Sequence, residues 1–351
     1  MFHNGQRSAS RLTIFLFLFL PHALGAEAQA GNQVPALLRE GQRALDARDF
    51  SHAVQNFEQA MQVAPENPEA NRGLVLGYLQ AGRLADAQRA AEIAVARWPR
   101  DAQLQHWLGL AYFKQGQWES ALPALRHAES LDGARADIHF DIALVLLSGN
   151  QYPEAADELE KSIKIDPGAA LPHVLLGRAY QNTNRSEQAV EQFQKALRLQ
   201  PDIPLGHYHL GFAYASLGRN QEAIAEYKSE LARAPNNSAV LYQLGHCLLA
   251  AGDWKSAVRD LKRAVEVDPR NADANYDLGK ALLLQGDADG AILAFRRATA
   301  LKPSDPGAHY QLARALEKVG RKKEAQQELQ MFTALKSAQP AVGGMATAPI
   351  P

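Results

Sequence analysis

The amino-acid sequence predicts an all-α protein, an α-solenoid of nine helix–turn–helix repeats that are each 34 residues long. Three observations support this prediction: alanine, glycine or asparagine, and proline each recur with the same period. Numbering each repeat from 1 to 34, starting at Val34, puts alanine at position 20 in all nine repeats: Ala53, Ala87, Ala121, Ala155, Ala189, Ala223, Ala257, Ala291 and Ala325. No insertion interrupts the period, so the array extends over residues 34–339.

The first helix of each repeat, helix A, has glycine at position 8 in six repeats, for example Gly177 and Gly211. Glycine at position 8 and alanine at position 20 let two helices approach closely, so the pair is expected to form a tight antiparallel hairpin. Position 15 is glycine or asparagine in eight repeats, for example Gly82 and Asn150. Both residues tolerate the left-handed conformation that ends a helix, so position 15 should begin the turn into helix B.

The second helix, helix B, is expected to stop at proline, which occupies position 32 in seven repeats. Position 34 then offers a side-chain oxygen that can cap the next helix A. The residues that can do so are Asn67, Asp101, Asn237, Asn271 and Asp305.

These positions, together with apolar residues at 7, 11 and 24, resemble the tetratricopeptide repeat family over residues 34–339. The fifth repeat carries the pattern as Leu176, Gly177, Tyr180, Ala189, Phe193, Ala196 and Pro201. The departures lie in the terminal repeats, where Glu40, Arg48 and Phe332 occupy family positions. The resemblance implies a right-handed superhelix whose concave face is lined by helix A and binds peptides or helices.

The ends of the chain differ from the array. Arg7 and Arg11 precede the apolar run 12–20, and small residues follow, which predicts a secretory signal peptide over residues 1–30, cut after Ala28 or Ala30. The alternative is an uncleaved anchor, the only membrane attachment that the sequence suggests. We therefore expect export to the periplasm or beyond. Residues 340–351, rich in Ala, Gly and Pro, are expected to be a disordered tail.

Net charge and cysteine content limit the classes of partner and cross-link that we expect. The formal net charge is −1, which gives no electrostatic drive toward nucleic acid. Cys247 is the only cysteine, so no disulfide forms within the chain, and its position is filled by small packing residues in other repeats.

Candidate binding residues lie at positions 5 and 9 of helix A, which are four residues apart and share one stripe of the helix. The later repeats combine tyrosine with basic groups there, a chemistry suited to peptides and carboxylates. Tyrosine at position 5 can also serve only the packing between adjacent helices. The candidates are Arg178, Tyr208, Tyr242, His246, Tyr276, Lys280, Tyr310 and Arg314, with Phe140 and Leu144 in an apolar early half.

No nucleophile, phosphate loop or paired-acid motif stands out, so neither an active site nor a cofactor is expected. Histidine recurs at position 4 as His139, His173, His207 and His309, but equivalent helices lie about 8–10 Å apart, too far for shared zinc ligation. The leading hypothesis is a non-enzymatic scaffold that binds protein segments. The alternatives are an accessory subunit that positions a separate glycan-modifying or envelope-assembly enzyme, and an enzyme without a recognisable motif.

Overall fold

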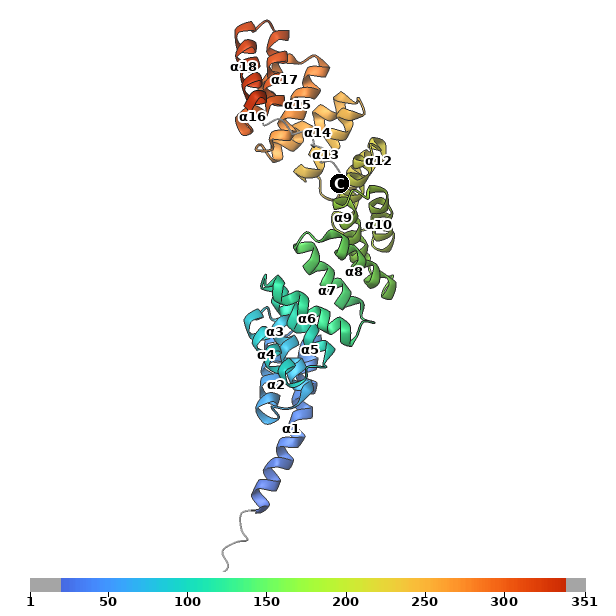
Figure 1. Ribbon diagram of the computed structural model, residues 1–351, viewed down its shortest axis with the longest axis vertical. Coiled ribbons are helices and arrows are strands. Elements are labelled where there is room, and N and C mark those ends of the chain that lie inside the picture. Colours follow the sequence, from blue (N-terminus) through green and yellow to red (C-terminus); the bar gives the residue numbers. More distant parts are fainter. Residues whose placement is uncertain (1–19, 339–351) are drawn as a thin grey trace, which may run out of the picture. The chain divides into compact units, whose positions relative to one another are not determined.

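The computed structural model describes residues 20–338, with side chains from residue 33 onward, and its regular elements in that range are helices (Figure 1). Residues 1–19 of the expected signal peptide and the expected tail 340–351 lie outside the described residues. Within the described range, no helix combines the length and apolar character needed to cross a bilayer.

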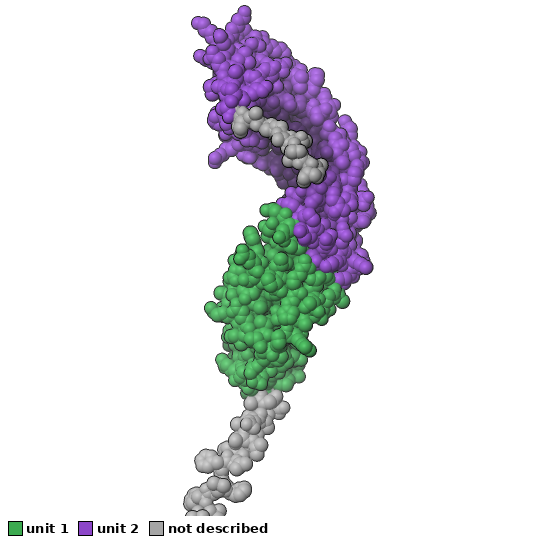
Figure 2. Space-filling view, in the orientation of Figure 1, with its two compact units in different colours: residues 1–151 green, residues 152–351 purple. Residues whose placement is uncertain are grey.

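The helices fall into two compact units, residues 1–151 and 152–351 (Figure 2). Unit 1 contains α1 (Leu20–Asp46), α2 (Phe50–Val63), α3 (Pro68–Gln80), α4 (Leu84–Arg97), α5 (Ala102–Lys114), α6 (Trp118–Leu131) and α7 (Ala136–Ser148). Unit 2 contains α8 (Tyr152–Ile165), α9 (Ala170–Asn182), α10 (Ser186–Leu199), α11 (Gly206–Ser216), α12 (Asn220–Arg233), α13 (Ser238–Ala250), α14 (Trp254–Val267), α15 (Ala272–Gln285), α16 (Ala288–Leu301), α17 (Pro306–Lys318) and α18 (Lys322–Ala338). Within each unit, helices A and B of a repeat pack together, and helix B also packs against the next helix A.

The predicted turns are confirmed at position 15. All nine residues there have positive φ values, between 58° and 92°. Eight of them are Gly or Asn, and the exception is Arg48, with a φ of 59°. A left-handed conformation costs least for Gly and is tolerated by Asn, so Arg48 stores more strain than the residues at this position in the other repeats.

The predicted helix ends are also confirmed. Helix B ends at position 30 in each of the first eight repeats, two residues before the proline in seven of them and before Gly133 in the third. The five Asn and Asp residues at position 34 then cap the next helix A through side-chain oxygens. Asn67, for example, accepts a hydrogen bond of 2.9 Å from the backbone of Ala70.

The close helix contact within a hairpin is confirmed as well. A Cβ at Gly177 would lie 2.6 Å from the ring of Phe193, and one at Gly279 would lie 2.6 Å from the ring of Phe295. The nine alanines at position 20 are at most 1% exposed. In the six repeats with glycine at position 8, glycine therefore makes room for the aromatic or leucine side chain at position 24.

A polar contact joins neighbouring repeats. Tyr214 at position 11 receives a 2.8 Å hydrogen bond from Gln194 on the preceding helix B, and Arg219 lies over its ring at 4.6 Å. Tyr180 repeats this arrangement by donating to Glu160, with Arg185 over its ring at 4.1 Å. Each tyrosine thus buries its ring while its hydroxyl keeps a partner, which fixes the register of successive hairpins.

Candidate functional site

The first helices of successive repeats form a row within unit 2. Helices α9, α11, α13, α15 and α17 each contact the next in this order. The position-5 tyrosines lie along the row, where Tyr208, Tyr242 and Tyr276 are half-buried and Tyr310 is 41% exposed.

The tyrosine rings have a packing role. The ring of Tyr208 lies 6.1 Å from that of Tyr227, and the ring of Tyr276 lies 5.9 Å from that of Phe295, in both cases the position-24 residue of the same repeat. Tyr310 packs in the same way against Phe332 of α18, at 5.3 Å. Tyr208, Tyr276 and Tyr310 are therefore anchored by helix B, whereas the ring of Tyr242 lies 6.1 Å from that of His246 on the same helix.

Two of the predicted basic residues lie over these rings. The amino group of Lys280 is 5.5 Å from the centre of the Tyr276 ring, and the guanidinium of Arg314 is 6.0 Å from that of Tyr310. A cation over an aromatic face is held by the ring quadrupole, which limits the freedom of both side chains. Binding a ligand then costs less side-chain entropy.

Lys280 and Arg314 line one pocket of about 280 Å³ between α15 and α17. Lys318 adds a third cation, Leu283 and Leu284 supply apolar surface, and Gln311 completes the lining. None of the described lining residues is acidic. We call this the basic pocket, and its chemistry suits a carboxylate next to an aliphatic group.

Two acidic residues near the basic pocket have side-chain partners. Asp277 receives a 2.7 Å contact from His246 Nδ1, whereas Lys280 Nζ is 3.8 Å from its other oxygen. Asp273 is bound by Lys302 Nζ at 2.7 Å. The hydrogen bond to Asp277 is the main reason that the pKa of His246 is raised above its usual value. His246 is thus better placed to neutralise Asp277 than to contact a ligand directly.

Arg178 lies at a different place in unit 2, close to His209. The imidazole of His209 stacks on Phe193 at 5.5 Å and meets Tyr208 edge-on at 5.5 Å. Burial, and secondly the charge of Arg178, lower the pKa of His209 to about 4. The ring is therefore neutral at pH 7 and acts as an aromatic side chain.

The early half of the predicted groove belongs to unit 1. Phe140 and Leu144 are half-buried on α7. Leu76 lines a pocket of about 360 Å³ together with Phe57 and Trp107. Arg39, Glu69 and Arg72 also line this pocket, and the early half lies in a different unit from the basic pocket.

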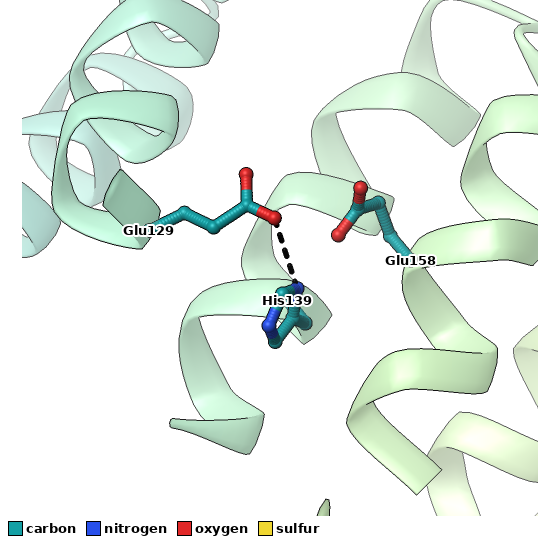
Figure 3. A group of neighbouring side chains, drawn as sticks. All are labelled: Glu129, His139 and Glu158. Atoms are coloured by element: carbon teal, nitrogen blue, oxygen red, sulfur yellow. Dashed lines mark ion pairs between the residues drawn. The ribbon is translucent and has the colours of Figure 1, made fainter. Parts of the chain in front are cut away.

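The histidines at position 4 have a structural use that the sequence did not reveal. His309 Nε2 lies 3.0 Å from the carbonyl of Pro303, and Asn275 donates to the carbonyl of Pro269 at 3.4 Å. His139 makes the same contact with Gly133 at 3.1 Å, and its Nδ1 lies 3.5 Å from Glu129 (Figure 3). In five repeats, position 4 therefore carries a polar side chain that satisfies the carbonyl at position 32 of the previous repeat. His173 and His207 instead contact Gln192 and Glu226 of their own repeats.

Cys247 is buried on α13, and burial raises the pKa of its thiol to about 11. A thiol in this environment stays protonated and unreactive near neutral pH. This agrees with a packing role at position 10.

Two residues that line the basic pocket, Lys318 and Leu284, both lie at position 13 and were not predicted from the sequence. Position 13 follows position 9 by four residues, so the helical stripe used for positions 5 and 9 could have included it. His209 at position 6 gave no such signal, because its neutral state depends on burial by residues of two repeats.

Models of the tetratricopeptide repeat family match residues 38–85, 72–132, 108–170, 174–238 and 242–306, and a further model of the same description matches residues 282–346. Among curated proteins, none matches the sequence. The Cut9 complex with Hcn1, from the APC/C, is 18% identical, with a TM-score of 0.51, and covers 76% of this chain and 52% of that chain.

Two further solved structures are similar over about half of the chain. YrrB, a TPR protein with an unusual peptide-binding site, is 24% identical, with a TM-score of 0.49, and covers 54% of this chain and 97% of its own. MamA from Desulfovibrio magneticus RS-1 is 22% identical, with a TM-score of 0.46, and covers 48% of this chain and 96% of its own.

Proposed function

Because this chain belongs to the tetratricopeptide repeat family, we propose that it is a non-enzymatic scaffold that binds segments of other proteins along its first helices. The observation that supports this most is the basic pocket. Lys280, Arg314 and Lys318 converge there beside two leucines, without an acidic residue among the described lining residues. The packing of the repeats gives no reason for three cations at one place, whereas electrostatic attraction of an acidic segment does.

The expected ligand is an acidic protein segment, or a C-terminal one, with an aliphatic side chain next to its carboxylate. The carboxylate would accept hydrogen bonds from Arg314 and Lys280, and the aliphatic group would cover Leu283 and Leu284. Lys280 lies over the ring of Tyr276 and Arg314 over the ring of Tyr310, so the pocket is largely preformed.

The second part of the proposal is export. It rests on the signal-like composition of residues 1–30. Sequencing the N-terminus of the mature protein tests it, with a start at Gln29 or Gly31 expected. A mature protein that still begins at Met1 would show that the segment is retained.

The double substitution Lys280→Ala with Arg314→Ala tests the binding proposal. The probe is a fluorescein-labelled peptide Gly-Glu-Leu-Glu-Gly, with Gly-Gln-Leu-Gln-Gly as the uncharged comparison, and the readout is fluorescence anisotropy. We expect the double variant to weaken binding of the acidic peptide by roughly 30-fold or more, because truncating a central charged anchor costs about 2 kcal/mol. The melting temperature should change little, since neither residue is a core residue.

The matched control is Lys195→Ala with Lys255→Ala. Both lysines are exposed on second helices, α10 and α14, and their removal changes the net charge by the same amount. This variant should bind like the wild type. If both double variants bind the acidic peptide equally weakly, the weakening is caused by the change in net charge, and the basic pocket is refuted as the binding site.

A further inference from the structure

A second charged surface lies in unit 1 and shares Arg72 with the pocket that Leu76 lines. It is a cleft of about 780 Å³ at the loops that join the second, third and fourth repeats. Four arginines line it, Arg72, Arg97, Arg100 and Arg135, together with Trp98. We call it the arginine cleft.

The sequence departs from the repeat pattern at this cleft. Position 34 is Asn or Asp in five repeats and caps the next helix, but in the third repeat it is Arg135, and α7 has no side-chain cap. Losing such a cap costs about 1 kcal/mol. The guanidinium of Arg135 instead donates to Gln103 at 2.7 Å, inside the cleft. Helices α9 and α11 also lack a side-chain cap, so the arginine, and not the lost cap, distinguishes the third repeat.

The charges in the cleft are only partly balanced. The two acidic lining residues are Asp101 and Asp132. Asp101 is already committed, since it accepts two hydrogen bonds from the backbone of α5 and one of 2.7 Å from Arg72. Among the described residues Arg100 has no ion pair. Arg135 pairs with Asp137, which is 54% exposed, and Arg97 pairs with Glu66, which is 75% exposed. An exposed pair of this kind is worth little and is easily exchanged for another carboxylate.

From this arrangement we propose that the arginine cleft binds an acidic segment of a partner protein, as an interface separate from the basic pocket. Arginine recognises carboxylates through two parallel hydrogen bonds, and arginine and tryptophan dominate the strong positions of protein interfaces. Discrete carboxylates on a peptide can be placed between Asp101 and Asp132. The continuous charge of a phosphodiester chain would meet repulsion from both, which favours a protein ligand over nucleic acid.

Hydrogen–deuterium exchange of the full chain with a hexaglutamate peptide tests the proposal, with hexaglutamine and single-stranded oligothymidylate as comparisons. The expected result is slower exchange in residues 97–103 with hexaglutamate and with neither comparison. Arg97→Ala with Arg100→Ala should raise the peptide concentration needed for this protection by roughly tenfold or more, as expected for loss of arginine anchors. Both side chains are exposed, so the fold should survive, which circular dichroism checks.

The variant Lys280→Ala with Arg314→Ala should leave protection of residues 97–103 unchanged. Binding at the basic pocket is measured separately, as protection of α15 and α17, so the two proposals can fail independently. Three results would overturn the arginine cleft: no protection of residues 97–103 at saturating hexaglutamate, equal protection by oligothymidylate, or undiminished protection in the Arg97 and Arg100 variant.

Discussion

Substituting His209 with phenylalanine should remove a specific loss of stability in acid. In the folded protein His209 stacks on Phe193, and burial, with the charge of Arg178 as a second cause, lowers its pKa to about 4. In the unfolded chain the pKa of histidine is about 6.5. Between these values the unfolded chain binds a proton that the folded protein does not, so the stabilisation is complete above about pH 6.5 and is lost as the pH falls toward about 4.

The size of the effect follows from the shift. About 2.5 pKa units at 1.36 kcal/mol each correspond to a loss on the order of 3 kcal/mol between about pH 7 and about pH 4. This is a large part of the stability of a typical domain. Phenylalanine keeps the stacking on Phe193 but cannot bind a proton, so the variant should lack this loss.

The assay is urea unfolding followed by far-UV circular dichroism at about pH 7 and about pH 4, for the wild type and for His209→Phe. Other titrating groups act equally on both proteins, so the difference between their free energies of unfolding isolates His209. The exposed residue His127 supplies the control, and His127→Gln should follow the wild type. Parallel losses of stability in the wild type and His209→Phe would refute the reasoning.

Three further substitutions test other parts of the structure. Tyr227→Phe should raise the free energy of unfolding by about 1 kcal/mol, because the buried hydroxyl of Tyr227 has no hydrogen-bond partner among the described residues. Tyr214→Phe removes a hydrogen bond to Gln194, so it should lower the free energy of unfolding in the same urea titration. Arg48→Gly should raise the melting temperature slightly, since relief of a φ of 59° gains up to about 1 kcal/mol; a lower melting temperature would contradict the assigned strain. The pKa of His246 is raised in the folded protein, so the stabilisation from its contact with Asp277 is complete below about pH 6.5 and is lost as the pH rises through the folded-state pKa. Asp277→Asn should abolish this pH dependence of the free energy of unfolding. An unchanged pH profile in the variant would exclude the His246–Asp277 pair as the cause.

Much of the fold could be predicted because it is local. Position 15 must leave the helical conformation, and Gly or Asn marks it in eight of nine repeats. Capping by Asn67 or Asp305 needs only a side-chain oxygen and the next few backbone groups. The contact of Gly177 with Phe193 could be anticipated because both residues belong to one hairpin with a fixed period.

The sequence by itself determined the repeat, the boundaries of its helices and the row of tyrosines and cations at positions 5 and 9. Only the tertiary structure decided which of these side chains cooperate. It joined Lys280 and Arg314 with Lys318, paired His246 with Asp277, and brought four arginines of two repeats to one cleft. The physical reason is that hydrogen bonds and secondary structure depend on neighbours in the chain, whereas charge balance, burial and pKa depend on neighbours in space, which the period of the sequence does not specify.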